Sequence, residues 1–245
     1  MKQAFPTRRM LAGLAAIAVA VGAVAIWPKV GQMRGKVYKD GSYFAVSDAD
    51  AHGYSTALVT ISNDRITRVV LNEITEKGVP KDFSTYPWPA SKEAHEKLPA
   101  QFVAKNGTDV DVIAKATEST NKYKQAVARA LEKARVSPTD KSKYFDGTFF
   151  GKSASGPHGY AVTRVTIKGD KITGVVLDWV SADGTMMDWA NEAKSFPTGV
   201  KARDEMAKRF VEKNSADVDV FTGATNSSQA YKEAVANALK TATIR

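Results

Sequence analysis

The chain has 245 residues, of which 43% are hydrophobic and 25% charged, a globular composition with room for two ordinary domains. It contains no cysteine, which excludes disulfides, thiolate metal sites, cysteine-bound haem, cysteine-held iron–sulfur clusters and a lipid anchor on cysteine. The net charge of +9 fits a partner of opposite charge, such as anionic lipid or an acidic redox protein. Nucleic acid is not expected, because the basic residues are mixed with acidic ones and form no run interleaved with aromatic residues.

Residues 1–30 are typical of a targeting segment. Basic residues precede an apolar run over residues 10–27, an order that places the amino terminus in the cytoplasm and the rest of the chain outside it. The run is close to the shortest that spans a membrane, and residues 23–25 resemble a signal cleavage site. An anchor and a cleaved signal are both open, and we favour a single membrane anchor with an extracytoplasmic body.

The body of the chain is a tandem repeat. The segment DGSYFA at residues 40–45 recurs as DGTFFG at 146–151, and HGY at 52–54 recurs at 158–160, both 106 residues further on. The segment DVDV at 109–112 recurs 108 residues further on, so the second copy carries two additional residues between Gly184 and Met206. Two copies of this length indicate two domains rather than a solenoid. We place the first repeat at residues 35–135 and the second at 145–245, with a linker around residues 135–144.

Each repeat begins with strands and ends with helices. Residues 57–62 and 66–71 flank an Asn-Asp pair, and residues 162–168 and 172–177 flank a Gly-Asp pair, so a hairpin is predicted in each repeat. Helical spacing predicts a helix around Leu98, a matching one around Met206, and a closing helix in each repeat. The apolar faces of the closing helices are Tyr123, Ala126, Val127, Ala130 and Leu131, and Tyr231, Ala234, Val235, Ala238 and Leu239. This order predicts an α+β fold, with a small antiparallel sheet and packed helices in each repeat.

The stretch DVFTGATNSS at residues 219–228 lies just before the closing helix of the second repeat. Unpaired N–H groups and the positive end of the helix dipole collect at such a helix start, and Gly223 lets the backbone come close to a ligand. The stretch therefore suggests a site for a phosphate, with several hydroxyls beside it. The alternative is a helix cap that needs no ligand, since Ser, Thr and Asn are the usual N-cap residues.

These residues also resemble the flavinylation motif of FMN-binding domains, Asp-x-x-Thr/Ser-Gly-Ala-Thr/Ser-x-Thr, which occurs in ion-pumping redox complexes and in extracytoplasmic electron-transfer proteins. The agreeing positions are Asp219, Thr222, Gly223, Ala224 and Thr225. In that family a flavin transferase uses FAD to join FMN, through a phosphoester, to the last Thr of the motif. Ser227 stands at this position, so the resemblance implies FMN as the cofactor, Ser227 as its attachment residue and a flavin transferase as a partner. The Glu-Thr-Pro-Gly segment of the pump subunits is missing, which argues against membership in those pumps.

The first repeat has lost part of the motif. Ala114 and Lys115 stand where the second repeat has Thr and Gly, and Lys115 puts a side chain where the backbone would approach a phosphate. Glu118 adds a negative charge, although Lys115 itself could pair with a phosphate. Thr117 is kept and Ser119 matches the acceptor position. We interpret this copy as degenerate: a structural half, a looser FMN site or a partner-docking domain.

Two further groups of residues are candidates for the site. His158 and its counterpart His52 could lie near a flavin ring or relay protons, but we favour a turn residue kept through duplication, because His tolerates unusual backbone angles. Trp and Met residues of the second repeat could stack on the flavin, but we favour a core role for them. These are Trp179, Met186, Met187 and Trp189.

The function predicted from the sequence is that of a membrane-associated extracytoplasmic flavoprotein. It would carry electrons between a membrane donor and an external or periplasmic acceptor, with the redox chemistry supplied by FMN, and would not be a stand-alone enzyme. The alternative is a cofactor-free interaction module on the cell surface that kept the fold and lost flavinylation. An exported flavin reductase would need a nicotinamide site, for which the sequence shows no motif.

Overall fold

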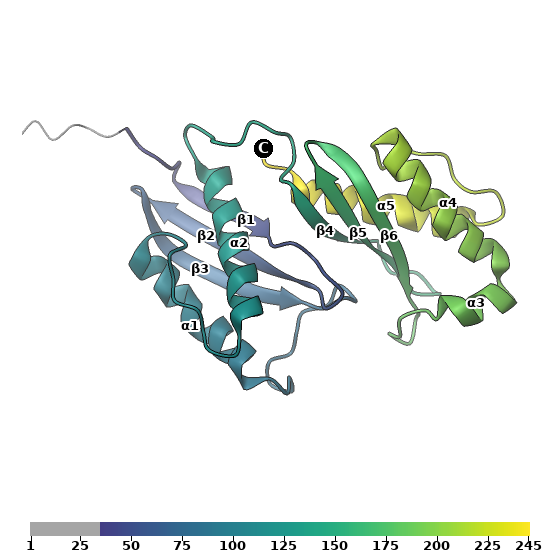
Figure 1. Ribbon diagram of the computed structural model, residues 1–245, viewed down its shortest axis with the longest axis horizontal. Coiled ribbons are helices and arrows are strands. Elements are labelled where there is room, and N and C mark those ends of the chain that lie inside the picture. Colours follow the sequence, from purple (N-terminus) through teal and green to yellow (C-terminus); the bar gives the residue numbers. More distant parts are fainter. Residues whose placement is uncertain (1–34) are drawn as a thin grey trace, which may run out of the picture. The chain divides into compact units, whose positions relative to one another are not determined.

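The computed structural model of the protein describes residues 35–245, and the predicted targeting segment lies outside them. These residues contain two three-stranded antiparallel sheets, each with its strands in chain order and with helices packed against it (Figure 1). The predicted α+β fold with two tandem copies is confirmed. No helix of the described part is long and apolar enough to cross a membrane.

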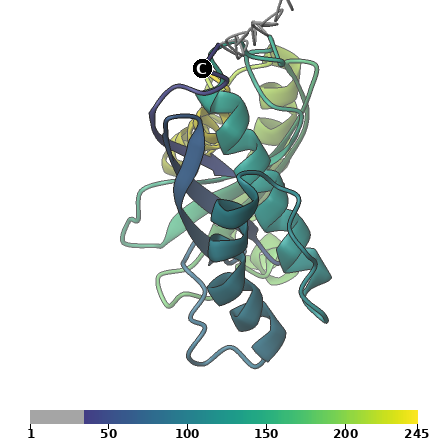
Figure 2. The same ribbon diagram turned by 90° about the vertical axis from the view of Figure 1, so that its left-hand side faces the viewer.

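The first repeat consists of β1 (Gly41–Val46), β2 (Tyr54–Ser62), β3 (Arg65–Ile74), α1 (Pro89–Lys105) and α2 (Thr117–Ala134). The predicted hairpin is confirmed: Asn63 and Asp64 have φ of 52° and 61°, the left-handed pair that a two-residue turn between twisted strands requires. Both helices lie over one face of the sheet (Figures 1 and 2). Beneath them Leu98, Phe102 and Tyr123 are fully buried, which confirms the apolar helix faces.

The second repeat consists of β4 (Gly147–Lys152), β5 (Tyr160–Lys168), β6 (Lys171–Val180), α3 (Trp189–Ser195), α4 (Pro197–Lys213) and α5 (Thr225–Ala242). The helix α3 has no counterpart in the first repeat, and it contains the place where the second copy is longer by two residues. It begins at the Asp188 carboxylate, which accepts hydrogen bonds from the N–H groups of Ala190 and Asn191. This helix is not among those predicted from the sequence.

Arg129 of α2 connects the two repeats. Its side chain is only 8% exposed, and its guanidinium donates to the carbonyl of Val46 at 2.9 Å and to the carboxylate of Asp48 at 2.7 Å. The same group donates to the carbonyl of Asp146 in the second repeat at 2.8 Å and lies 4.7 Å from the centre of the Phe149 ring. One buried side chain thus joins the end of β1 to the start of β4.

Candidate functional site

The turn at residues 222–225 leads directly into α5. Gly223 has a φ of +85°, where a side chain is strained, and a Cβ built there would lie 3.3 Å from the Thr198 methyl group. The N-cap is Ala224, and no side chain among residues 35–245 caps the helix. The alternative of a Ser, Thr or Asn cap is therefore wrong, and within the described part of the chain the N–H groups of the first turn have no side-chain partner.

One hydroxyl of the stretch has a purely structural task. Ser228 is fully buried, and its Oγ donates to the carbonyl of Ala224 at 2.9 Å and accepts from the N–H of Phe221 at 3.0 Å. In the first repeat Thr120 holds the turn in the same way, accepting from the N–H of Ile113 at 3.3 Å. This role is not among those predicted from the sequence, although a hydroxyl residue at the same position of both copies signals it.

A cavity of about 390 Å³, the second-repeat cavity, opens beside the start of α5. Its walls are mainly aromatic and come from β6, α3, α5 and the loops between them; they include Trp179, Met187, Trp189, Phe196 and Tyr231. The Trp179 ring meets the Tyr231 ring edge-on, with the ring centres 6.2 Å apart. Such walls offer flat apolar surfaces to a planar ligand.

Hydrogen bonds fix both indole rings of this cavity. The indole N–H of Trp179 donates to the carbonyl of His158 at 2.9 Å, and that of Trp189 donates to the Asp178 carboxylate at 2.8 Å. The Arg203 guanidinium lies 4.6 Å from the centre of the Trp189 ring. The ring planes are therefore set by the protein before any ligand binds.

Of the predicted site residues of this repeat, Ser227 and His158 line the cavity. The side chain of Ser227 is partly exposed, and its hydroxyl makes no hydrogen bond to another residue between 35 and 245. The turn residues Thr222, Gly223, Ala224 and Thr225 do not line the cavity, whereas Asn226, between the turn and Ser227, does. Asp219 does not line it either, and its carbonyl accepts from Arg209 of α4 at 2.9 Å.

The structure corrects two of the preferred interpretations. Met187 and Trp189 line the cavity and are only partly buried, so a core role is wrong for them. Trp179 lines the cavity and also packs against the core of the second repeat, and Met186 packs against a small buried cluster, as expected. His158 lies in a turn, as does His52, but both also line cavities. The unusual backbone angle belongs to the glycine that follows each of them, with φ of +108° and +107°.

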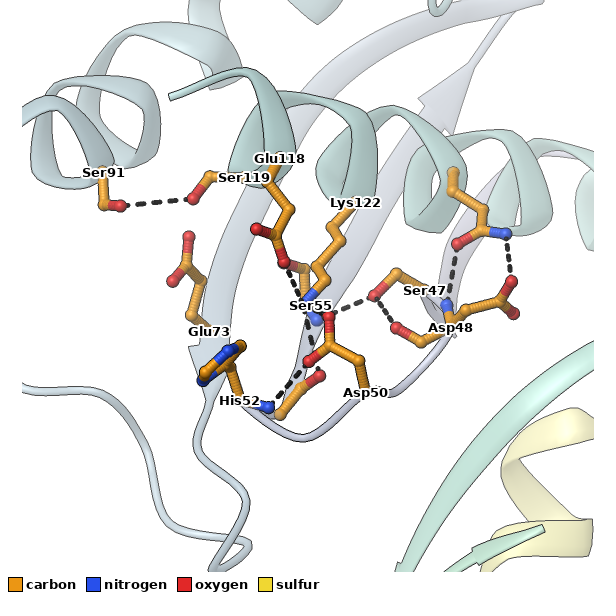
Figure 3. Close-up of polar contacts among 12 residues, drawn as sticks. Ser47, Asp48, Asp50, His52, Ser55, Glu73, Ser91, Glu118, Ser119 and Lys122 are labelled. Atoms are coloured by element: carbon orange, nitrogen blue, oxygen red, sulfur yellow. Dashed lines mark hydrogen bonds and ion pairs between the residues drawn. The ribbon is translucent and has the colours of Figure 1, made fainter. Parts of the chain in front are cut away.

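The first repeat has a cavity of the same volume at the corresponding place, the first-repeat cavity. Thr117 and Ser119 line it, and the Ser119 hydroxyl lies 3.3 Å from the Ser91 hydroxyl (Figure 3). Lys115 takes the position of the motif glycine with a φ of +62°, and its carbonyl accepts from the indole N–H of Trp88 at 2.9 Å. The turn therefore keeps its shape in this repeat despite the loss of glycine.

Charged side chains line this first-repeat cavity. The ammonium of Lys81 pairs with the carboxylate of Glu73, and that of Lys122 lies 2.6 Å from Asp50 and 3.2 Å from Glu118 (Figure 3). Burial lowers the pKa of Lys81, but the hydrogen bond and the charge of Glu73 outweigh it and raise this pKa overall. Lys81 is therefore charged at neutral pH.

The family model of the FMN-binding domain matches residues 51–132 and 156–240, more than half of the chain. The chain belongs to the FMN-binding domain family. FMN is therefore its cofactor, as the motif implied. Among solved structures the chain is similar to the CPE2226 protein from Clostridium perfringens, at 30% identity over 40% of this chain and 88% of that one, with a TM-score of 0.35. A comparison with the curated proteins finds no match.

The residues of the second repeat fit this cofactor. Aromatic rings offer flat surfaces and a thioether offers a polarizable apolar contact to an isoalloxazine ring, and an uncapped helix start with a glycine in the turn suits a phosphate. Gly199 adds to the fit, because it lines the cavity and a Cβ there would lie 2.4 Å from the Phe196 ring. Trp179, Trp189 and Met187 would hold the ring, and the turn and Ser227 would hold the phosphate.

Proposed function

We propose that this FMN-binding protein is an extracytoplasmic electron carrier whose flavin is held covalently by Ser227. The observation that carries the proposal is the position of Ser227. It lines one cavity with Trp179, Met187 and Trp189, and only Asn226 separates it from the motif turn. When bound, FMN supplies the redox chemistry. The chain supplies the attachment point, the orientation of the ring and the exclusion of water around it.

Attachment requires a flavin transferase and FAD. The Ser227 oxygen attacks the phosphorus on the riboflavin side of the FAD pyrophosphate, so a new O–P bond forms while the bond to the AMP half breaks. AMP leaves, and the hydroxyl proton passes to solvent. The partly exposed side chain of Ser227 supports this step, because an enzyme must reach it, and the neighbouring turn offers uncapped N–H groups for the phosphate.

The test of attachment compares two matched serines. The full chain is produced with a flavin transferase and examined by in-gel fluorescence after denaturation and by intact mass. Ser227→Ala should abolish the fluorescent band and the added mass, whereas Ser119→Ala, at the equivalent position of the first repeat, should keep both. A fluorescent band of equal strength in the Ser227→Ala protein contradicts the assignment. A parent chain that is colourless when isolated from its native membrane supports the cofactor-free interaction module instead.

The location and the partners of the carrier are part of the proposal. The basic-then-apolar order of residues 1–30 supports an anchor with the body outside the cytoplasm, between a membrane donor and an external or periplasmic acceptor. Protease added to intact spheroplasts should digest the body, and the intact mass of the native protein should include residues 1–30. Complete protection from the protease would show that the body lies in the cytoplasm, contrary to this proposal.

A further inference from the structure

The two cavities are built on the same framework, which allows their walls to be compared position by position. In the β2–β3 ladder Glu73 lies opposite Ser55, and in the β5–β6 ladder Trp179 lies opposite Ala161. Glu73 of the first repeat therefore occupies the place of the Trp179 indole.

At a second position of the wall, too, a charged residue of the first repeat stands in place of an apolar residue of the second. The N–H of Lys81 donates to the carbonyl of Glu73 at 2.8 Å, as the N–H of Met187 donates to that of Trp179 at 2.9 Å. Lys81 therefore stands where the second repeat has Met187. A Trp–Met wall in one repeat has become a Glu–Lys ion pair in the other.

The ion pair is buried and closely surrounded. The side chains of Lys81 and Glu73 are 14% and 8% exposed, and the Lys81 ammonium lies 4.0 Å from the centre of the Tyr86 ring. The second carboxylate oxygen of Glu73 is buried without a hydrogen-bond partner in the described part of the chain. Figure 3 shows Glu73 reaching from its strand toward Ser91 and Ser119, in the cavity that these residues line.

We propose that Glu73 and Lys81 exclude the flavin ring from the first repeat, so that the chain carries a single flavin, on the second repeat. This inference rests on the proposed function. A flavin ring placed in the first-repeat cavity would meet two charges instead of an indole and a thioether. The ring would either displace the water that still hydrates the two charges, offering no polar group in its place, or separate Glu73 from Lys81. Both are strongly unfavourable, because a buried charge needs hydration or a partner.

The acceptor position is also less available in the first repeat. The Ser119 hydroxyl lies 3.3 Å from that of Ser91, whereas the residue that corresponds to Ser91 in the second repeat is Gly199, which has no side chain. Lys122 does not compensate by drawing in a phosphate, since it is already paired with Asp50 and Glu118. The altered motif turn is therefore one of two barriers to flavin, because the wall excludes the ring independently of it.

The test uses the full chain with Ser227→Ala, so that only the first repeat can receive covalent flavin, produced with a flavin transferase. One variant restores the motif alone, with Ala114→Thr and Lys115→Gly. The other restores the motif and also carries Glu73→Trp and Lys81→Met, which removes both charges together. We expect no in-gel fluorescence from the first variant and one flavin on Ser119, located by peptide mass, in the second. Flavin per chain, measured before and after denaturation, should be one in the unaltered protein.

Each other outcome has a defined meaning. Full loading of the motif-only variant, or two flavins on the unaltered chain, would overturn the role of the ion pair. Absence of flavin from the wall-restored variant would also overturn it, provided that a thermal melt shows a folded protein. If Glu73→Trp prevents folding, a variant with Glu73→Leu and Lys81→Met is used in its place and is also judged by flavin on Ser119. A parent chain without any flavin would instead contradict the proposed function.

Discussion

Ser227 and Ser228 are consecutive in α5 and have opposite environments. The hydroxyl of Ser228 is fully buried and makes two hydrogen bonds, whereas that of Ser227 lines the second-repeat cavity and makes none within residues 35–245. A cofactor attachment point needs an accessible hydroxyl, and a stable turn needs a buried one. Substitutions at these neighbours should therefore separate stability from flavin loading.

Ser228→Ala should lower the free energy of unfolding of the apo protein by about 1–2 kcal/mol, because it leaves the partly buried N–H of Phe221 without its hydrogen-bond partner. Ser227→Ala should change it by less than about 0.5 kcal/mol, as is usual for a substitution away from buried contacts. Urea unfolding of both variants measures the difference. Thr120→Ala in the first repeat is the matched control and should also destabilise while leaving flavin loading unchanged. Equal losses of unfolding free energy in Ser227→Ala and Ser228→Ala would contradict the assignment of a structural role to Ser228 alone.

Gly223 and Lys115 provide a second matched pair, since both have left-handed backbone angles, with φ of +85° and +62°. Gly223→Lys should cost about 1–2 kcal/mol of stability, because it places a side chain in the left-handed region beside Thr198. Flavin loading should fall much further, because the side chain blocks the approach of a phosphate to the turn.

The reverse change, Lys115→Gly, should stabilise the first repeat by about 1 kcal/mol by relieving the same strain. Thermal melting of the apo proteins and flavin content after coexpression with the transferase check both substitutions. A Gly223→Lys protein that melts normally and is fully flavinylated would show that the turn takes no part in binding.

The parts of the fold that depend on neighbours in sequence could be predicted. The turn at Asn63 and Asp64 and the apolar faces of the closing helices follow from local spacing, and the structure confirms both. The motif turn was likewise evident from residues 219–228. Local patterns also gave one wrong prediction, a side-chain cap at the start of α5. The hydroxyl that stabilises this helix start belongs to Ser228, which lies inside the helix and donates to the carbonyl of Ala224.

The cavity walls could not be predicted from such patterns. Trp179 and Met187 reach the cavity from a strand and the following loop, far from the motif in sequence, and a Trp or Met pattern does not tell whether a ring faces a core or an opening. The pairing of Glu73 with Lys81 is evident only once β3 and the loop after it are folded. The sequence therefore locates the difference between the two repeats in the motif alone, whereas in the structure the cavity walls differ as well.

Arg129 should couple the two repeats so that they unfold in one cooperative transition. Arg129→Met removes the donor that reaches Asp48 and the carbonyl of Asp146, leaving these acceptors without their charged partner. We expect a loss of about 2–4 kcal/mol, below the upper range for buried pairs because the Asp48 side chain is 46% exposed. Arg129→Lys should recover little of it, because an ammonium cannot reproduce the fork of hydrogen bonds.

Differential scanning calorimetry of the full chain tests this role. The unaltered protein should unfold in one transition and the Arg129→Met protein in two, or in one that is markedly broader. Asn237 occupies the corresponding position of α5 and donates only to the carbonyl of Lys152, at 2.8 Å, so Asn237→Ala serves as the control and should keep a single transition. A single sharp transition in the Arg129→Met protein would show that other contacts hold the repeats together.

His95 should make stability fall between about pH 7.5 and pH 5.5. Its ring stacks on Phe83 with the ring centres 4.5 Å apart, and its Nδ1 lies 3.4 Å from the Tyr123 hydroxyl. Burial lowers the pKa of His95, and the charges of Glu73 and Glu96 oppose this shift only in part. The native state therefore binds a proton less readily than the unfolded chain, in which a histidine titrates near about 6.5.

The sign of the effect follows from proton linkage. Above the unfolded pKa both states are neutral at His95 and the stabilisation is fully present, whereas below it the unfolded state takes up a proton first and stability falls with pH. His95→Gln should therefore show a smaller decrease in melting temperature between about pH 7.5 and pH 5.5 than the unaltered protein does. Arg203 occupies the corresponding position of α4, so Arg203→Gln serves as the control and should leave the decrease unchanged. An equal decrease in the His95→Gln protein would assign the acid sensitivity in this range to other groups.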